Sequence, residues 1–424
     1  MKSIRIILLF MLITMLNGTQ KSGTQDFPLD IVQYPFIRYE LNKLHFYQDS
    51  SRFSAFFHKL DKLILAGEGQ IKILHIGDSH IQADYISGRI RQRLQTFFKG
   101  GIASRGLIFP YKAAGTNNPF NYYAYFTGEW EGCRNVERDK YCTLGLSGIS
   151  ATTYDSAATL KFLFRQGDYP HYDFNRIKIF HKIDTAAYKV VIENYEGERT
   201  VNINREAGYT EFILHKHLDE LVLKFLKTDA KQYYFTIQGI LLETDDPGIV
   251  YHSAGVNGAD IPSFMRCQAF DKHLKVIDPD LIIISLGTND AYPKKFNRLF
   301  FEADCEALLN KIRRSTPERP VILTVPPDSY RYRRYLNKNI PEARKAIIKV
   351  AKEYHCAVWD LYTVMGGSNS MILWYSNGLT AADKLHFNKK GYFLQGDLFF
   401  NAFVKAYDNY IFNERRNGKK SALK

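Results

Sequence analysis

Two parts of this 424-residue chain alternate apolar, strand-length runs with helical segments, and a stretch without helical periodicity separates them. In the second part, strands are predicted at 249–252, 281–285, 321–325 and 357–361, and helices at 262–277, 299–315, 341–354 and 391–411. Continuous apolar strands that alternate with helices are typical of a parallel sheet covered on both faces. The pattern therefore predicts an α/β domain.

The first part contributes one strand to this sheet. A predicted helix at 53–65 leads into an apolar run at 73–76, and Gly77, Asp78 and Ser79 follow before a helical pattern over 81–99. Ser79 is therefore expected on a strand-to-helix turn at the carboxyl edge of the sheet, where N–H groups and the helix dipole favour developing negative charge. Gly-Asp-Ser also forms ordinary turns and helix caps, so this stretch alone does not identify a nucleophile.

Between the two parts, short alternating runs replace the helical period. They lie at 160–164, 177–180, 188–192, 221–225 and 234–237, with turn residues between them. This texture is typical of an antiparallel β-sandwich. We therefore predict an α/β domain split into 27–119 and 246–412, with a sandwich inserted at 120–245.

The N-terminus has the pattern of a signal peptide. Lys2 and Arg5 precede an apolar core at 6–16, which is short for a membrane span, and polar residues follow it. We predict a signal peptide at 1–20 and a periplasmic or otherwise exported protein. An uncleaved N-terminal anchor is the open alternative, and membrane contact is expected only in that case. At the other end, 413–424 is predicted to be a basic, solvated tail.

The net charge and the cysteine content limit which partners and which cellular compartment can be expected. The formal net charge of +13 suits an anionic partner, but export argues against nucleic acid. Cys133 and Cys142 are close enough in sequence to bridge in an oxidising compartment. The other three cysteines, Cys267, Cys305 and Cys356, are interpreted as core thiols.

No cofactor or metal motif is present in the sequence. It contains no Walker phosphate loop and no zinc-ligand spacing. We interpret His215 and His217 as exposed strand or turn histidines, and we predict neither a cofactor nor a metal.

Three further polar stretches follow predicted strands. They are 255–260, 286–290 and 379–387. Each has a structural interpretation, because the glycines suit tight turns, Asn289 and Asp290 suit an Asx cap, and Asp383 suits a helix start. We assign structural roles to Asp78, Asp84 and Asp290.

Together, the four stretches meet the requirements of acyl transfer. A serine hydroxyl such as that of Ser79 needs a histidine to take its proton, and the histidine needs a carboxylate to hold its tautomer. Asp383 and His386 are three residues apart, so one turn brings their side chains together. The N–H groups of Ser79 and Gly258 and the amide of Asn289 are candidate donors to the oxyanion.

The order of these blocks resembles the SGNH, or GDSL-type, hydrolase superfamily. The matching residues are 77–79, Gly258, 287–290 and 383–386. The resemblance implies a flavodoxin-like three-layer α/β fold. It also implies that Ser79 is the nucleophile, His386 the general base and Asp383 its orienting acid, with Ser79, Gly258 and Asn289 forming the oxyanion hole.

A narrower resemblance involves 75–84, 239–243, 251–259 and the inserted sandwich. These features are similar to the peptidoglycan O-acetylesterases of Gram-negative bacteria, in which a carbohydrate-binding-module-like sandwich interrupts the SGNH domain. The resemblance implies removal of acetyl from the 6-hydroxyl of muramic acid. For the insert only the texture matches, so a carbohydrate-binding role is an expectation without assigned residues.

The sequence therefore predicts an exported serine esterase that removes O-acetyl groups from a cell-wall glycan through an acetyl-serine intermediate. The expected partner is O-acetylated peptidoglycan. Three alternatives stay open: a glycan O-acetyltransferase, which shares the covalent intermediate; an esterase for another acetylated polysaccharide; and a non-catalytic wall-binding protein with a relic site.

Overall fold

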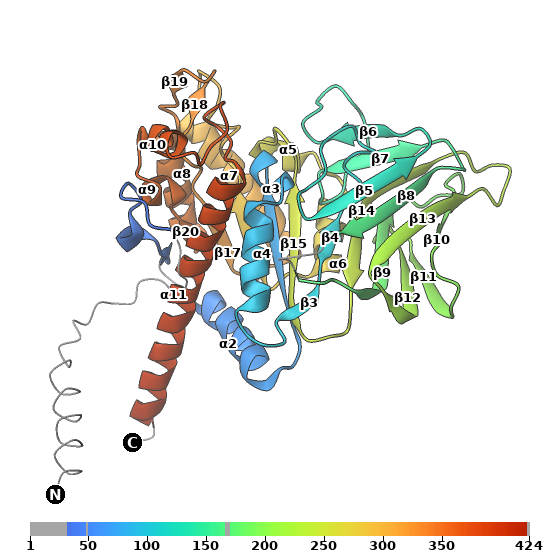
Figure 1. Ribbon diagram of the computed structural model, residues 1–424, viewed down its shortest axis with the longest axis horizontal. Coiled ribbons are helices and arrows are strands. Elements are labelled where there is room, and N and C mark those ends of the chain that lie inside the picture. The colour runs from blue at the N-terminus through green and yellow to red at the C-terminus, as the bar shows by residue number, and fades with distance from the viewer. Residues whose placement is uncertain (1–31, 48–49, 166–169, 422–424) are drawn as a thin grey trace, which may run out of the picture.

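The computed structural model describes residues 32–47, 50–165 and 170–421, with side chains as far as Glu414 (Figure 1). The predicted signal peptide at 1–20 lies outside these residues. A sheet of seven strands forms the centre of the α/β part, in the order β1-β20-β17-β16-β2-β15-β3. Its strands are β1 (Leu44–His45), β2 (Gln70–Gly77), β3 (Ile102–Ser104), β15 (Gly248–Gly255), β16 (Leu281–Ser285), β17 (Val321–Thr324) and β20 (Ala357–Trp359). All neighbours pair in parallel except β1 with β20.

Helices cover both faces of this sheet. One face carries α2 (Ser51–Ala66), α4 (Ile86–Thr96) and α11 (Lys389–Ser421), and the other carries α5 (Ile261–Met265), α6 (Phe270–Ile277), α7 (Arg298–Ser315) and α8 (Ile340–Glu353). Successive strand residues supply opposite cores, because side chains alternate along a strand. In β2, Ile73 belongs to the core under α2 and Leu74 to the core under α7. The predicted three-layer α/β fold class is confirmed.

The inserted sandwich consists of two antiparallel sheets, ordered β10-β13-β8-β5 and β11-β12-β9-β14-β7-β6. Its strands are β5 (Tyr122–Thr127), β6 (Glu131–Arg134), β7 (Ile149–Thr153), β8 (Thr159–Phe164), β9 (Phe174–His181), β10 (Lys189–Ile192), β11 (Arg199–Asn204), β12 (Tyr209–Leu218), β13 (Glu220–Leu226) and β14 (Phe235–Glu243). A core of its own lies between the sheets. Figure 1 shows the sandwich on the side of the central sheet where β15 and the edge strand β3 lie.

The sandwich begins earlier than the predicted boundary at 120. Strand β4 (Gly106–Ile108) pairs with β14, and Ile108 lies in the core of the sandwich. Three residues are too few to show an alternating pattern, so this strand could not be predicted from the sequence. The chain thus leaves the central sheet at β3 and enters the sandwich within two residues.

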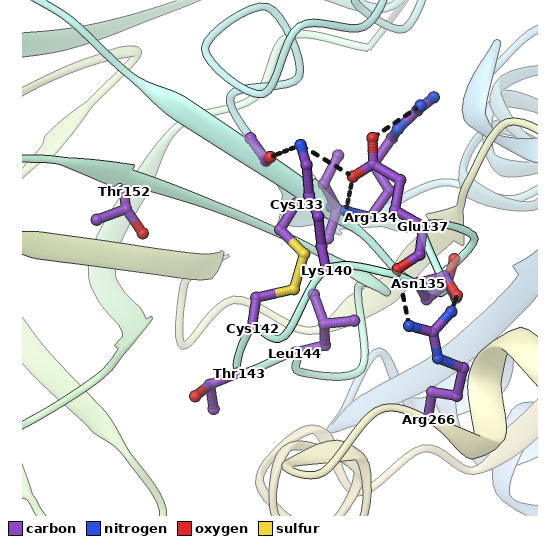
Figure 2. Close-up of a disulfide and its surroundings, with 12 residues drawn as sticks. Cys133, Arg134, Asn135, Glu137, Lys140, Cys142, Thr143, Leu144, Thr152 and Arg266 are labelled. Atoms are coloured by element: carbon purple, nitrogen blue, oxygen red, sulfur yellow. Dashed lines mark hydrogen bonds and ion pairs between the residues drawn. A yellow bond between two sulfur atoms is a disulfide. The ribbon is translucent and has the colours of Figure 1, made fainter.

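A disulfide joins Cys133 and Cys142, the pair that the sequence suggested. Figure 2 shows the loop that it closes and the guanidinium of Arg266, which comes from the α/β part between α5 and α6. Arg266 donates hydrogen bonds of 2.8 Å to the carbonyl oxygens of Asn135 and Glu137. The disulfide loop is thereby attached to the α/β part. Cys267, Cys305 and Cys356 are free and buried.

Two predicted helices are interrupted. The segment 81–99 forms α3 (Ser79–Gln82) and α4, separated at Asp84, whose φ is +53°. The buried carboxylate of Asp84 accepts hydrogen bonds from Arg91 at 2.6 Å and Arg105 at 3.1 Å, so a long-range ion pair overrides the local helical pattern. Likewise, 262–277 forms α5 and α6 instead of one helix.

The last helix is longer than predicted. Helix α11 extends to Ser421, beyond the predicted helix end at 411 and into the predicted basic tail at 413–424. The sequence 411–417 contains no glycine or proline, and nothing in its backbone chemistry ends the helix there. Among the described residues, no helix combines the length and apolar character needed to cross a membrane.

The Asp84 cluster yields a stability prediction. Asp84→Asn keeps a residue type that tolerates positive φ but leaves Arg91 and Arg105 buried without a counter-charge. We expect the free energy of unfolding to fall by about 3–5 kcal/mol, measured by urea denaturation.

Asp278→Asn is the matched control. Asp278 also has a positive φ, 45°, and pairs with Arg319 at 3.0 Å, but its side chain is 62% exposed. We expect a change below about 1 kcal/mol. Equal losses in the two variants would contradict the importance of burial at Asp84.

Candidate active site

The carboxyl end of β2 places Ser79 at the first position of α3. Gly77 ends the strand, and a Cβ there would lie 2.2 Å from Ile81 Cγ1 and 2.9 Å from the carbonyl oxygen of Ser285. Only glycine fits this approach. Asp78 then caps α3, because its Oδ1 accepts the N–H of His80 at 2.9 Å. The local sequence thus fixes the direction in which the Ser79 side chain leaves the sheet.

The structure brings Ser79, His386 and Asp383 into one chain of hydrogen bonds. Ser79 Oγ lies 2.9 Å from His386 Nε2, although the two residues are 307 positions apart. His386 Nδ1 lies 2.7 Å from Asp383 Oδ2. The other oxygen of Asp383 accepts the backbone N–H groups of Leu385 at 3.0 Å and His386 at 2.9 Å. The tight turn therefore holds the carboxylate against the imidazole.

The electrostatics suit a base at His386. Burial raises the pKa of Asp383, but the hydrogen bonds from the His386 side chain and from two backbone N–H groups lower it more, so the pKa lies below its usual value. An ionised Asp383 keeps the proton of His386 on Nδ1 and leaves Nε2 free to accept the Ser79 proton.

The predicted oxyanion donors gather beside Ser79. Asn289 Nδ2 donates to the carbonyl oxygen of Ala259 at 2.9 Å and, over a longer 3.3 Å, to Asp78 Oδ2. Gly258 has a φ of +82°, and a Cβ at this position would meet no atom within 4 Å. In the described part of the chain, the N–H groups of Ser79 and Gly258 have no hydrogen-bond acceptor. These donors are therefore available to a developing oxyanion.

His80 is a site residue that the sequence reasoning missed. Its ring centroid lies 5.2 Å from that of His386, and its Nδ1 lies 2.8 Å from the hydroxyl of Tyr392. Burial, followed by the neighbouring His386, lowers the pKa of His80 to about 3, so this ring is neutral. The imidazole of His80 is therefore an uncharged neighbour of the base. Its position next to Ser79 in the sequence was the only available signal.

Two buried carboxyl groups underlie the site. Burial raises the pKa values of Asp78 and Asp290 to about 7, although hydrogen bonds from backbone N–H groups oppose this. Asp290 Oδ1 accepts the N–H of Ile261 at 3.0 Å, and its Oδ2 is buried without a partner among the described residues. Both groups connect the loops that carry Ser79, Gly258 and Asn289.

No group of three or more His, Cys, Asp or Glu side chains within the described ranges is arranged to hold a metal ion.

Comparison with known protein families relates part of this chain to one of them. Residues 237–394 match the GDSL-like Lipase/Acylhydrolase family. Residues 237–394 thus resemble a GDSL-type hydrolase domain. The matched range includes Gly258, Asn289, Asp383 and His386, whereas Ser79 precedes the inserted sandwich. The match confirms the predicted relationship to the GDSL-type hydrolases and the predicted enzyme class, a carboxylic ester hydrolase.

One solved structure extends the similarity of fold beyond residues 237–394. A structure described as a peptidoglycan O-acetylesterase in action covers 86% of this chain and 99% of its own, with a TM-score of 0.72 and 23% identity. A lipase/acylhydrolase from Enterococcus faecalis covers 36% of this chain and 74% of its own, with 25% identity and a TM-score of 0.30. A GDSL-like lipase from Bacteroides thetaiotaomicron covers 38% and 76%, with 17% identity and a TM-score of 0.29. No curated protein sequence matches.

The buried carboxyl of Asp290 gives a prediction for pH dependence. Its pKa of about 7 in the folded chain exceeds the value of about 4 for an unfolded aspartate. The folded state therefore binds the proton more tightly, and this stabilisation is complete below about pH 4 and is lost as the pH rises toward 7.

Asp290→Asn removes this titration. We expect the free energy of unfolding of the variant to fall less between pH 5 and pH 8 than that of the unaltered chain, by about 1.4 kcal/mol for each pH unit between 5 and the pKa of the folded state. Urea denaturation at the two pH values measures the difference. An equal fall in both proteins would contradict the raised pKa.

Proposed function

We propose that this protein is an exported serine esterase that removes O-acetyl groups from a cell-wall glycan, with peptidoglycan muramic acid as the substrate. The single observation that carries the catalytic part is the continuous hydrogen-bonded path from Ser79 Oγ through His386 to Asp383. This path supplies a nucleophile, a base and an orienting carboxylate in the order that ester cleavage requires.

The reaction follows from these positions. Ser79 Oγ attacks the acetyl carbonyl carbon while His386 Nε2 takes the hydroxyl proton. The oxyanion accepts hydrogen bonds from the N–H groups of Ser79 and Gly258 and from Asn289 Nδ2, which exchanges its long 3.3 Å bond to Asp78 for one to the oxyanion. The C–O bond to the sugar then breaks, and His386 returns the proton to the sugar oxygen. Water, deprotonated by His386, hydrolyses the acetyl-serine to acetate and free Ser79.

The choice of an acetylated glycan is supported by the extent of one structural similarity. The peptidoglycan O-acetylesterase fold covers both the GDSL-type domain and the inserted sandwich of this chain, at 86% coverage. The two lipase structures named above cover less than two fifths of it. The arrangement of the whole chain, sandwich included, thus favours a substrate of the same kind.

Export is supported by two separate features. The apolar segment at 6–16 has signal-peptide character. The disulfide between Cys133 and Cys142 suits an oxidising compartment such as the periplasm.

Ser79→Ala tests the catalytic assignment. We expect the variant to retain its circular dichroism spectrum and to lose at least about 10³-fold in kcat/KM for acetate release, because the nucleophile is removed. A serine-directed fluorophosphonate should label the unaltered protein and leave this variant unlabelled. Ser376→Ala, at an exposed serine of α10 (Ser370–Ser376), is the matched control and should keep full activity.

The substrate is tested by acetate release from O-acetylated peptidoglycan, acetylated xylan and a short aryl acetate. The proposal requires the highest kcat/KM for peptidoglycan. Acetyl transfer to an added chitooligosaccharide faster than acetate release would assign a transferase instead. An unlabelled protein without acetate release would be a wall-binding protein.

Export is tested by expressing the full chain in a Gram-negative host and sequencing the N-terminus of the protein in the periplasmic fraction. We expect a mature chain that lacks the segment 1–20 and contains the oxidised cysteine pair. A protein retained in the cytoplasm with its N-terminal segment would overturn the proposed location.

A further inference from the structure

A short basic hairpin borders the active site. It consists of β18 (Tyr330–Arg331) and β19 (Tyr335–Leu336), joined by a turn at 332–334. It follows β17, whose carboxyl end faces the same way as that of β2. In Figure 1, β18 and β19 lie at the same end of the sheet as α3, which carries Ser79.

The hairpin is attached to the loop that carries the base. The N–H of Tyr330 donates to the carbonyl oxygen of Lys384 at 2.9 Å, and Lys384 lies between Asp383 and His386 in the sequence. The ammonium group of Lys384 in turn donates to the carbonyl oxygen of Arg333 at 3.4 Å. It also lies 5.6 Å from the ring centre of Tyr330.

The hairpin is also attached to the loop that carries Asn289. The N–H of Tyr332 donates to the hydroxyl of Tyr292 at 3.1 Å, and the N–H of Tyr292 donates to the carbonyl oxygen of Asn289 at 3.3 Å. Directly after the hairpin, Asn339 Nδ2 donates to the carbonyl oxygen of Ala291 at 2.9 Å. The hairpin therefore contacts the loops on two sides of the site.

The positive charge of the hairpin has no ion-pair partner in the described part of the chain. Residues 329–341 contain Arg331, Arg333, Arg334 and Lys338 and no Asp or Glu. None of these four cations forms an ion pair with a carboxylate of the described residues. Nε and Nη1 of Arg331 are buried without a hydrogen-bond partner in the same part of the chain. The side chains of Arg333 and Arg334 are exposed, so these two unpaired cations can bind an anionic ligand beside the active site.

The backbone conformation of the turn also indicates a functional role for the hairpin. The N–H of Arg334 donates to the carbonyl oxygen of Arg331 at 3.1 Å, and the two central residues, Tyr332 and Arg333, have φ values of +52° and +64°. Glycine or asparagine is strongly preferred at such positions. The side chain of Tyr332 is 72% exposed, so packing in the interior does not explain the choice. Strain that persists at an active-site edge is a sign of a functional side chain.

We propose that this hairpin is a specificity element that binds carboxylate groups of an acidic glycan and thereby positions the acetylated sugar at Ser79. This inference rests on the proposed function. Arginine is suited to the task because its planar fork matches a carboxylate with two parallel hydrogen bonds. Arg331, which is partly exposed, and Arg333 and Arg334, which are exposed, supply the charge.

The test compares one O-acetylated glycan oligomer in two forms, with free carboxylates and with the carboxylates amidated. For Arg333→Gln/Arg334→Gln, we expect KM for the free-carboxylate form to rise about five- to tenfold with kcat within about twofold, because exposed charge pairs act mainly on binding. The preference for the free-carboxylate form over the amidated form should fall by the same factor. Arg331→Lys, which keeps the charge and loses the fork, should also raise KM.

Lys275→Gln/Arg314→Gln is the matched control. It removes the same net charge from exposed positions of α6 and α7, near helix ends that precede strands and therefore lie at the opposite edge of the sheet. We expect no change in the preference. As a measurement independent of variants, salt should raise KM of the unaltered protein more for the free-carboxylate form than for the amidated form.

Equal KM values for the two forms in the unaltered protein, together with acetate release from both, would overturn the role of the hairpin and leave the esterase proposal intact. An equal loss of preference in the control variant would also overturn it, because the effect would then come from net charge alone. Absence of acetate release from either form and from an aryl acetate would overturn the esterase proposal itself.

Discussion

The parallel pairing of β2 between β15 and β16 is the constraint on which the active site depends. Gly77 at the end of β2 pairs in register with Gly255 of β15 and with Ser285 of β16, so three strands end at the same level. Glycine at 77 and 255 lets α3 lie directly over these ends, since a Cβ on Gly255 would be 2.2 Å from the backbone nitrogen of Gln82. A bulkier residue at either position would displace the turn that presents Ser79.

The charges around Ser79 are arranged so that one carboxylate acts on the base. Asp383 is held ionised by hydrogen bonds from His386 and from the backbone, whereas burial raises the pKa of Asp78 and Asp290 to about 7. His80, in contact with the base, is neutral. A positive imidazolium at His386 is therefore stabilised by Asp383 without competition from a second cation beside it. The cationic hairpin is attached to the same loop as the base, through the hydrogen bond from Tyr330 to Lys384.

The inserted sandwich leaves the central sheet undisturbed because the chain exits and re-enters at adjacent strands. Strand β3, before the insert, and β15, after it, are neighbours in the sheet. Strand β4 pairs with β14 beside this junction, and the disulfide loop is fixed to Arg266 of the α/β part. The insert thus begins and ends at adjacent strands of the central sheet and is held to the α/β part by the hydrogen bonds of Arg266, which explains how it can interrupt the domain without separating Ser79 from His386.

The sequence by itself determined the alternation of strands and helices, the short motifs at the strand ends and the pairing of Asp383 with His386, because these depend on local periodicity and on residues close in the chain. Only the tertiary structure decided the break at Asp84, which buried arginines from distant positions impose on a helical pattern. It also decided the pairing of the three-residue strand β4, the contact of His80 with His386 and the attachment of the basic hairpin to two active-site loops. Each of these arises from contacts between residues far apart in the chain, and no local pattern encodes them.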